Sequence, residues 1–444
     1  MTPPRTTTGL LRSLGLDRPE LRAWALYDWA NSAFVTTIVT AVFPVYFSAV
    51  AAADLPPAVA TARFATASTV ALVLVALMSP FLGAVADRTP IKKPLLGAFL
   101  ALGVAATAGL ALVGWGDHRL AEILFAAGNV GLMGSFVFYD ALLPHIATDA
   151  EMDRVSAAGY ALGYLGGGLL LFANLVALKN PAWLGLPDAA AASRASFASV
   201  AVWWAVFSIP LFVRVREPRV VGPREGAAQE AWRALARTGR ALREYRPAAV
   251  LLVAYLFYND GIGTIYRMAA IYGAEIGLDS GALLLTLAVT QIVSIPFAFA
   301  FGALGARIGA RRALFLALAV YLGISGGAYF LRTEAHFFLL AMAVAVVQGG
   351  AQSLSRSLFA TLVPRDRAAQ FFGLFGVADK VSGVLGPLVF AAVTTATGSS
   401  RHAIVSVAVF FVVGGALLAF VDVPLGQRLA REGERPREDG PERA

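Results

Sequence analysis

The sequence contains no cysteine among its 444 residues and only four histidines. The absence of cysteine excludes disulfides, thiolate metal sites and a cysteine nucleophile. The four histidines are scattered, so we expect no metal site and no cofactor. Charged residues make up only 14% of the chain, against about 25% in a typical soluble domain. The chain also lacks a GxxxxGK[ST] phosphate loop, so we expect that it does not hydrolyse ATP.

Apolar residues, in contrast, are abundant. They make up 58% of the chain, and the mean hydropathy is +0.69, which is typical of a protein that crosses a membrane many times. The first 20 residues carry three arginines but no apolar core, so we expect no cleavable signal peptide. Runs of about 20 apolar residues predict twelve spans, at residues 23–50, 62–86, 91–115, 119–142, 156–178, 195–214, 247–273, 280–304, 312–331, 336–362, 370–396 and 402–424.

The distribution of lysine and arginine predicts how these spans are oriented. With the N-terminus in the cytoplasm, 27 of the 36 basic residues fall in cytoplasmic segments and 6 in external ones. Positive residues favour the cytoplasmic side, so we predict that both termini are cytoplasmic. The net charge of +8 is therefore a topology signal with some attraction to anionic lipid, and it does not indicate nucleic-acid binding.

The longest polar interruption divides the chain into two sets of six spans. From Gln229 onward, apolar residues recur at helical spacing between arginines, which predicts an amphipathic helix on the cytoplasmic leaflet. The charged, proline-containing end of the chain is typical of disorder. We therefore expect a cytoplasmic N-terminal segment, a six-helix bundle, a cytoplasmic amphipathic linker, a second six-helix bundle and a disordered tail, at residues 1–22, 23–214, 215–246, 247–424 and 425–444.

The two halves repeat each other in sequence. "GAVADRTPIKKP" follows the second span, and "GALGARIGARR" follows the eighth, 219 residues later. Pro144, Gly163 and Gly166 map onto prolines and glycines 220 residues further on. Two six-span repeats with cytoplasmic ends resemble the major facilitator architecture, an all-α membrane fold of two pseudo-symmetric six-helix bundles with substrate bound between them.

A loop motif strengthens this resemblance. Gly83, Asp87 and Arg88, followed by Lys92 and Lys93, are similar to the signature that the superfamily carries after its second helix, although Thr89-Pro90 replaces the Gly-Arg of the family. In the second copy of the motif, Ala306 stands where the acid is expected. The resemblance therefore implies a gating role for Gly83, Asp87 and Arg88 in the first half.

Three further stretches resemble one family within that superfamily. "WALYDWANSAF", "YDALLPHIA" and "YNDGIGTIYR" look like the vacuole-effluxer group, named for the autophagy-related amino-acid effluxers of fungal vacuoles. The resemblance implies efflux of a small polar or zwitterionic solute, a neutral amino acid, from a monomeric carrier in a prokaryotic cytoplasmic membrane. We expect alternating access and coupling to protons, because a carboxylate inside the membrane can load and release a proton during the cycle.

Six charged residues lie away from the ends of the predicted spans, and a charge in the membrane interior is costly unless it is paired, hydrated or neutralised. Three are acids and three are bases, which suggests pairing between the halves: Asp28, Asp260, Asp379, Arg267, Arg356 and Lys380. Asp28 and Asn31 share a helical face by the i, i+3 rule. Asp28 is either an acid at the membrane interface, near Arg22, or a cavity-facing carboxylate close to the cytoplasmic gate.

Asp260 and Arg267 lie on one polar stripe of the seventh span, where Gly261 and Gly263 would let a ligand approach the backbone. The stripe forms either a substrate site or a fixed structural pair. Gln348, Gln352 and Arg356 follow each other at i, i+4, i+8 on the tenth span and form a polar face. This face either binds substrate or makes hydrogen bonds between helices.

We assign the candidate residues as follows. The substrate-binding candidates are Asp260, Arg356, Lys380, Gln352, Gln348, Asn31 and Arg267. The proton-coupling candidates are Asp28 and Asp260, and the gating candidates are Gly83, Asp87, Arg88 and Asp140. An ammonium group of the solute would meet Asp260 or Asp28, and a carboxylate would meet Arg356 or Lys380. We name no catalytic residue.

Other functional classes remain as alternatives. "GISGG" at residues 323–327 matches the pattern of a hydrolase nucleophile, but it lies inside the ninth span without the strand-turn-helix context that the motif requires. The candidate bases His336 and His402 are both near the outer surface. A multidrug or metabolite efflux carrier of the same fold is one rival reading. A non-transporting membrane sensor or scaffold, suggested by the long linker, is the other.

Overall fold

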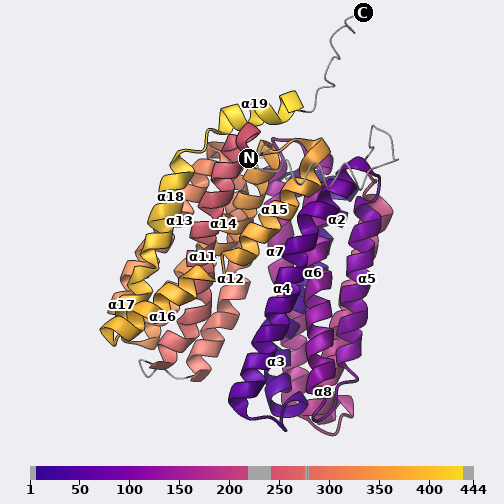
Figure 1. Ribbon diagram of the computed structural model, residues 1–444, viewed down its shortest axis with the longest axis vertical. Coiled ribbons are helices and arrows are strands. Elements are labelled where there is room, and N and C mark those ends of the chain that lie inside the picture. Colours follow the sequence, from indigo (N-terminus) through magenta and orange to yellow (C-terminus); the bar gives the residue numbers. More distant parts are fainter. Residues whose placement is uncertain (1–6, 219–241, 276–277, 279, 434–444) are drawn as a thin grey trace, which may run out of the picture.

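Twelve helical spans of membrane-crossing length form the molecule, as the apolar runs predict (Figure 1). The computed structural model describes residues 7–218, 242–275, 278 and 280–433. Within these residues the secondary structure is helical, without strands. The architecture is the expected one of two six-helix bundles that lie side by side.

The N-terminal bundle contains the first six spans. The first span is composite and runs through α2 (Pro19–Ala33), η1 (Phe34–Ala41), α3 (Val42–Tyr46) and η2 (Phe47–Ala51). The other five are α4 (Pro57–Arg88), α5 (Lys92–Leu110), α6 (His118–Ile146), α7 (Met152–Lys179) and α8 (Ala189–Arg214). The short helices α1 (Thr7–Ser13) and η3 (Pro181–Leu184) lie outside the spans.

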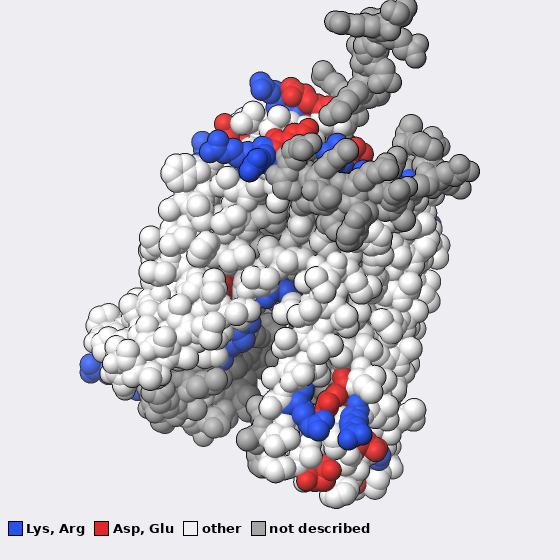
Figure 2. Space-filling view, in the orientation of Figure 1, with Lys and Arg blue, Asp and Glu red and all other residues white. Residues whose placement is uncertain are grey.

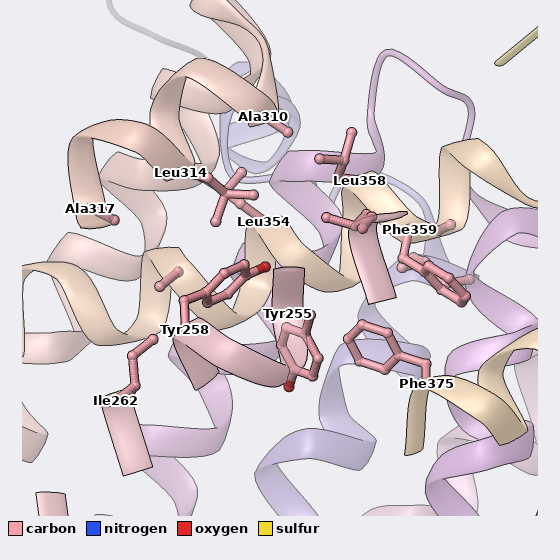
Figure 3. Packing of buried hydrophobic residues seen from close by; sticks show 14 of the residues in the cluster. Tyr255, Tyr258, Ile262, Ala310, Leu314, Ala317, Leu354, Leu358, Phe359 and Phe375 are labelled. Atoms are coloured by element: carbon pink, nitrogen blue, oxygen red, sulfur yellow. The ribbon is translucent and has the colours of Figure 1, made fainter. Parts of the chain in front are cut away.

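The C-terminal bundle contains the last six. They are α11 (Arg246–Glu275), α12 (Ser280–Ile308), α13 (Ala310–Gly327), α14 (Glu334–Leu362), α15 (Ala368–Val381) continued by α16 (Leu385–Thr397), and α17 (Ser400–Ser406) continued by α18 (Ala408–Ala419). Short 3-10 turns are η4 (Ala328–Phe330) and η5 (Arg365–Arg367). The buried core of this bundle joins α11, α13, α14 and α15 through Tyr258, Leu314, Leu354 and Phe375 (Figure 3).

Two spans depart from a regular α-helix. The first span changes to π-helix over Phe34–Ala41, just before Pro44, which has no backbone N–H to donate to the preceding turn. The eleventh span, expected as one helix over residues 370–396, is interrupted by a turn at residues 382–384. Interrupted helices expose backbone groups inside a membrane protein, and they often mark binding sites.

The expected linker and tail are described only in part. Residues 219–241, which include most of the predicted amphipathic linker helix, lie outside the described residues, as do residues 434–444. Residues 423–433, in contrast, form the helix α19 (Val423–Gly433), so the expected disorder is wrong for the first part of the tail. Arg431 of α19 binds Asp149 in the α6–α7 loop at 2.9 Å.

The bundles meet at one end and separate at the other. The closed end carries α19 and the α6–α7 loop that Arg431 of α19 contacts, and the open end carries α3 and α17 (Figure 1). At the closed end α4 and α6 pack on α15, and α7 packs on α12 and α14. Figure 2 shows a hollow between the bundles that widens toward the open end. By the charge distribution, the closed end is the one predicted to be cytoplasmic.

Candidate functional site

The Arg356 side chain of α14 crosses from the C-terminal bundle into the N-terminal bundle. Its Nη1 lies 3.2 Å from an Asp28 oxygen and 3.2 Å from an Asp140 oxygen. Its Nε and Nη2 donate to the hydroxyl and the carbonyl oxygen of Ser156, both at 2.9 Å. We call these four residues the Arg356 cluster. Only 3% of Arg356 is exposed, so its side chain does not reach the aqueous surface.

Three aromatic rings surround the same guanidinium. The Arg356 Cζ atom lies 4.5 Å from the ring centre of Tyr160, 4.8 Å from that of Trp24 and 5.7 Å from that of Tyr139. These are cation–π distances. These rings, the two carboxylates and Ser156 come from α2, α6 and α7. Arg356 of the C-terminal bundle is therefore held by groups of the N-terminal bundle.

The Arg356 cluster stabilises the closed end. A buried ion pair is costly to break, because removing one partner leaves an uncompensated charge in a region with little water. The bundles can part at this end only if Arg356 leaves its two carboxylates. The arrangement therefore makes the closed state depend on the charges of Asp28 and Asp140.

A second contact at the closed end uses the predicted gating motif. Asp87 at the end of α4 accepts hydrogen bonds from the backbone N–H groups of Ala369 (3.0 Å) and Gln370 (2.8 Å) in the first turn of α15. A carboxylate at a helix N-terminus is favourable because it pairs with free N–H groups and with the helix dipole. Lys92 lies 2.9 Å from the same carboxylate and is buried with it.

We expect Asp87→Asn to weaken the closed end strongly. The amide keeps one acceptor oxygen but leaves the Lys92 ammonium buried without its counter-charge, which costs about 3 kcal/mol or more. The melting temperature of the purified protein should fall by several degrees. The control is Asp422→Asn, because Asp422 is exposed and caps only the N-terminal turn of α19, within its own bundle. Equal melting temperatures for the two variants would contradict the role of Asp87.

The other gating candidates lie at the same end. Gly83 lies so close to the backbone of Ala369 that a Cβ atom there would overlap with it. Arg88 donates to the Ala84 carbonyl of its own helix at 3.1 Å. A third contact between the bundles joins the Ser357 hydroxyl to Asp153 at 2.5 Å. Sequence reasoning did not identify this contact.

A second polar group lies within the C-terminal bundle, midway along the eleventh span. The Asp379 carboxylate accepts from the Tyr255 hydroxyl (2.8 Å) and the Asn259 amide (3.1 Å), and it pairs with Lys380 at 2.7 Å. Although Asp379 and Lys380 are neighbours on the helix, their side chains contact each other. Both side chains are about 30% exposed, so this pair is more exposed than Arg356, whose side chain is 3% exposed.

This polar group lies on a helix that packs against the other bundle, because α15 contacts α4 and α6. Asp379 lies within electrostatic reach of Asp140 and Tyr160 across the interface. Beside it, Asp260 accepts from the backbone N–H of Gly386 at 3.0 Å, at the N-terminus of α16. Arg267, which is exposed, donates to the Gly383 carbonyl at 3.4 Å. Asp260 and Arg267 therefore both contact the backbone around the break in the eleventh span.

The three remaining substrate-binding candidates are amides, and two of them are buried and hydrogen-bonded to other protein groups. Asn31 is buried and donates to the Tyr27 carbonyl of its own helix at 2.7 Å. Gln348 is buried and donates to the Ser294 hydroxyl at 3.2 Å. Gln352 is half-buried on the same helix. The structure thus brings Asp28, Asp140 and Arg356 into direct contact, whereas Lys380 pairs with Asp379 and Asp260 with the Gly386 backbone N–H.

Sequence reasoning did not select the aromatic residues around Arg356 or its partner Ser156. One signal was available for Tyr160, which occupies the position equivalent to Lys380 under the 220-residue repeat. A second signal was the position of two of the aromatic residues beside candidate acids. Trp24 lies four residues before Asp28, which places both on one helical face, and Tyr139 lies one residue before Asp140.

Comparisons with known proteins point in one direction. Residues 57–431 match a family model described as vacuole effluxer Atg22 like. The MFS-type transporter YxiO of Bacillus subtilis is 37% identical over 402 residues, which cover 90% of this chain and 94% of that protein. Autophagy-related protein 22 of Pyricularia oryzae is 25% identical over 83% of this chain, but the match spans only 66% of the longer fungal protein.

Solved structures share the fold at low sequence identity. The major facilitator superfamily transporter FucP matches with a TM-score of 0.68 at 14% identity, over 91% of this chain and 100% of that chain. The proton:xylose symporter XylE matches with a TM-score of 0.67 at 13% identity, over 94% of this chain and 97% of that chain. Likeness at this level of identity concerns the fold alone.

Proposed function

The chain belongs to the Atg22-like vacuole effluxer family of major facilitator transporters, and from this premise we propose that it exports a neutral amino acid by proton-coupled alternating access. A transporter with this fold presents its binding site to one side at a time, by moving one bundle against the other. The hollow toward the open end and the contacts at the closed end are the features that such a cycle requires.

The observation that carries this proposal is the division of the charged residues into two groups. The Arg356 cluster is buried and joins the bundles, whereas the Asp379–Lys380 pair is partly exposed and lies on α15, a helix that packs on the other bundle. A zwitterion could exchange partners with that pair, its ammonium meeting Asp379 and its carboxylate meeting Lys380. Asn259 offers a neutral amide beside them, within 3.1 Å of Asp379.

Proton coupling is supported by the charge balance of the Arg356 cluster. Two carboxylates face one guanidinium, so the cluster accommodates one further positive charge. A proton on Asp28 or Asp140 would supply this charge and weaken the attraction on Arg356. Loading and unloading that proton would therefore favour opening and closing of this end in turn.

Transport in proteoliposomes tests the proposal. Radiolabelled neutral amino acids should accumulate in vesicles containing the wild-type protein, and an imposed pH gradient should accelerate uptake. Lys380→Ala and Asp379→Asn should each lower the initial rate at least tenfold, because they remove the two charges that the solute would meet. Arg428→Gln is the control and should keep the wild-type rate, because Arg428 is exposed and pairs only with Glu432 of its own helix.

Other outcomes would favour other functions. If amino acids are not transported but many lipophilic compounds are, the protein is a multidrug or metabolite efflux carrier. If no solute is transported and none raises the melting temperature, a sensor or scaffold role is favoured. Uptake that ignores the pH gradient would contradict the proton coupling while leaving amino-acid transport in place.

A further inference from the structure

The groups around the Arg356 guanidinium form a receptor for a cation that one bundle builds alone. Trp24 and Asp28 come from α2, Tyr139 and Asp140 from α6, and Tyr160 from α7. We call these five residues the cage. The C-terminal bundle supplies the Arg356 guanidinium that the cage holds.

The cage is organised by contacts that do not involve Arg356. The Trp24 indole N–H donates to the Tyr139 carbonyl at 2.9 Å, and the two rings stack with centres 4.4 Å apart. Gly159 leaves the space for the guanidinium, since a Cβ at that position would overlap with Asp28 and Arg356. The aromatic pair of Trp24 and Tyr139 would therefore keep its arrangement when Arg356 leaves.

Opening of the closed end would remove Arg356 and leave two carboxylates without a counter-charge. Some positive charge must then enter the site, because uncompensated charges at this depth are costly. Protons and small inorganic ions satisfy the carboxylates alone. Three aromatic faces at 4.5 to 5.7 Å favour instead a weakly hydrated organic cation, which gains cation–π attraction that a strongly hydrated ion does not.

We propose that, when the bundles have parted at the end that Arg356 holds closed, the cage binds the guanidinium or primary ammonium group of an organic solute in place of Arg356. The proposal deepens the proposed function, because it assigns a cation subsite to the transport cycle. Arg356 and the solute then compete for one receptor. Solute binding favours the open form of this end, and the return of Arg356 expels the cationic group from the cage.

Chemical rescue of Arg356→Ala tests this inference with methylguanidinium as the probe. In the purified full-length variant the cage is free, so methylguanidinium should raise the melting temperature in a saturable way, by roughly 5 °C, through mass action. The wild-type protein should show no such rise, because Arg356 already fills the cage. Arg356→Gln serves as a second variant if Arg356→Ala does not yield folded protein.

Controls separate the cage from general effects of the salt. Adding Asp28→Asn or Trp24→Leu to Arg356→Ala should abolish the rise. Arg311→Ala is the control for removing an arginine elsewhere, because Arg311 donates to backbone carbonyls at the end of α18. Methylguanidinium should not raise the melting temperature of this variant. Stabilisation by methylguanidinium that is equal in all variants, or absent from both Arg356 variants, would overturn the proposal.

A parallel titration separates an organic cation from a proton. If lowering the pH stabilises Arg356→Ala while methylguanidinium, methylammonium and sodium have no effect, the cage takes up protons only and the inference is wrong. None of these measurements depends on transport. The cage can therefore fail this test while amino-acid transport is confirmed, and the reverse can also occur.

Discussion

Arg356→Gln is expected to abolish transport and to open the end of the molecule that Arg356 holds closed. Glutamine cannot pair with Asp28 and Asp140 together, so two buried carboxylates lose their counter-charge, at a cost of about 3–5 kcal/mol to the closed arrangement. At ~1.4 kcal/mol per tenfold change, this shifts the balance between the two states by at least a hundredfold. The initial rate of uptake in proteoliposomes should fall to background.

Cross-linking shows whether this loss arises from the position of the bundles. The natural chain has no cysteine, so Asp153→Cys with Ser357→Cys places the only two thiols at a contact between the bundles. A short bifunctional thiol reagent should join them efficiently when Arg356 is present and at least tenfold more slowly in Arg356→Gln. Equal cross-linking rates would contradict the role given to Arg356. Arg428→Gln in the same double-cysteine chain is the control.

Gly83→Leu is expected to have an effect of similar size by a steric route. A Cβ atom at Gly83 would overlap with the backbone of Ala369, and one at Gly373 would overlap with that of Ser79. The two helices α4 and α15 therefore approach each other at glycines from both sides, as in other close helix contacts inside membranes. Leucine at position 83 prevents this approach, so the closed end cannot form and transport should fall at least tenfold.

Gly323→Leu is the matched control for this substitution. Gly323 lies on α13 and has no atom within 4 Å of the position that its Cβ would occupy. The same glycine-to-leucine change should therefore leave transport near the wild-type rate. If Gly83→Leu also transports normally, close contact of α4 with α15 is not part of the cycle.

Hydropathy and charge patterns predict the architecture of this protein well. Twelve apolar runs correspond to twelve helical spans among the described residues, and the repeat of the loop motif indicates two bundles. Each run is long enough to cross a membrane by itself, so its presence depends on local composition alone. The sequence does not predict the break at residues 382–384, where Asp260 contacts the Gly386 backbone N–H. It does not predict the helix α19 either, in which Arg431 binds Asp149 of the other bundle.

The pairing of charged residues depends on tertiary structure, and the sequence predicts it less well. Equal numbers of acids and bases in the spans suggested pairs between the halves, and Arg356 does bind Asp28 across 328 positions of sequence. The sequence could not tell which base meets which acid, because that choice depends on how each helix is rotated. Arg356 was therefore placed among the substrate-binding candidates, whereas the structure engages it fully between the bundles.

The stretches that resemble the effluxer family meet at these charged groups. "WALYDWANSAF" supplies Trp24 and Asp28, and "YDALLPHIA" supplies Tyr139 and Asp140. "YNDGIGTIYR" supplies Asn259 and Asp260, while its Tyr258 bonds to Ser355, the neighbour of Arg356. The first two stretches thus contact Arg356 at the interface between the bundles, and the third lies inside the C-terminal bundle beside the helix that carries Arg356.

The central claim is that Arg356 holds the bundles together at the closed end, and distances between spin labels test it most directly. Labels on introduced cysteines at exposed Ala150 and Ile308 report on the closed end, and labels at exposed Ala53 and Ala335 report on the open end. In Arg356→Gln we predict that the first distance lengthens and the second shortens, relative to the protein with Arg356. Unchanged distances for both pairs would contradict the account.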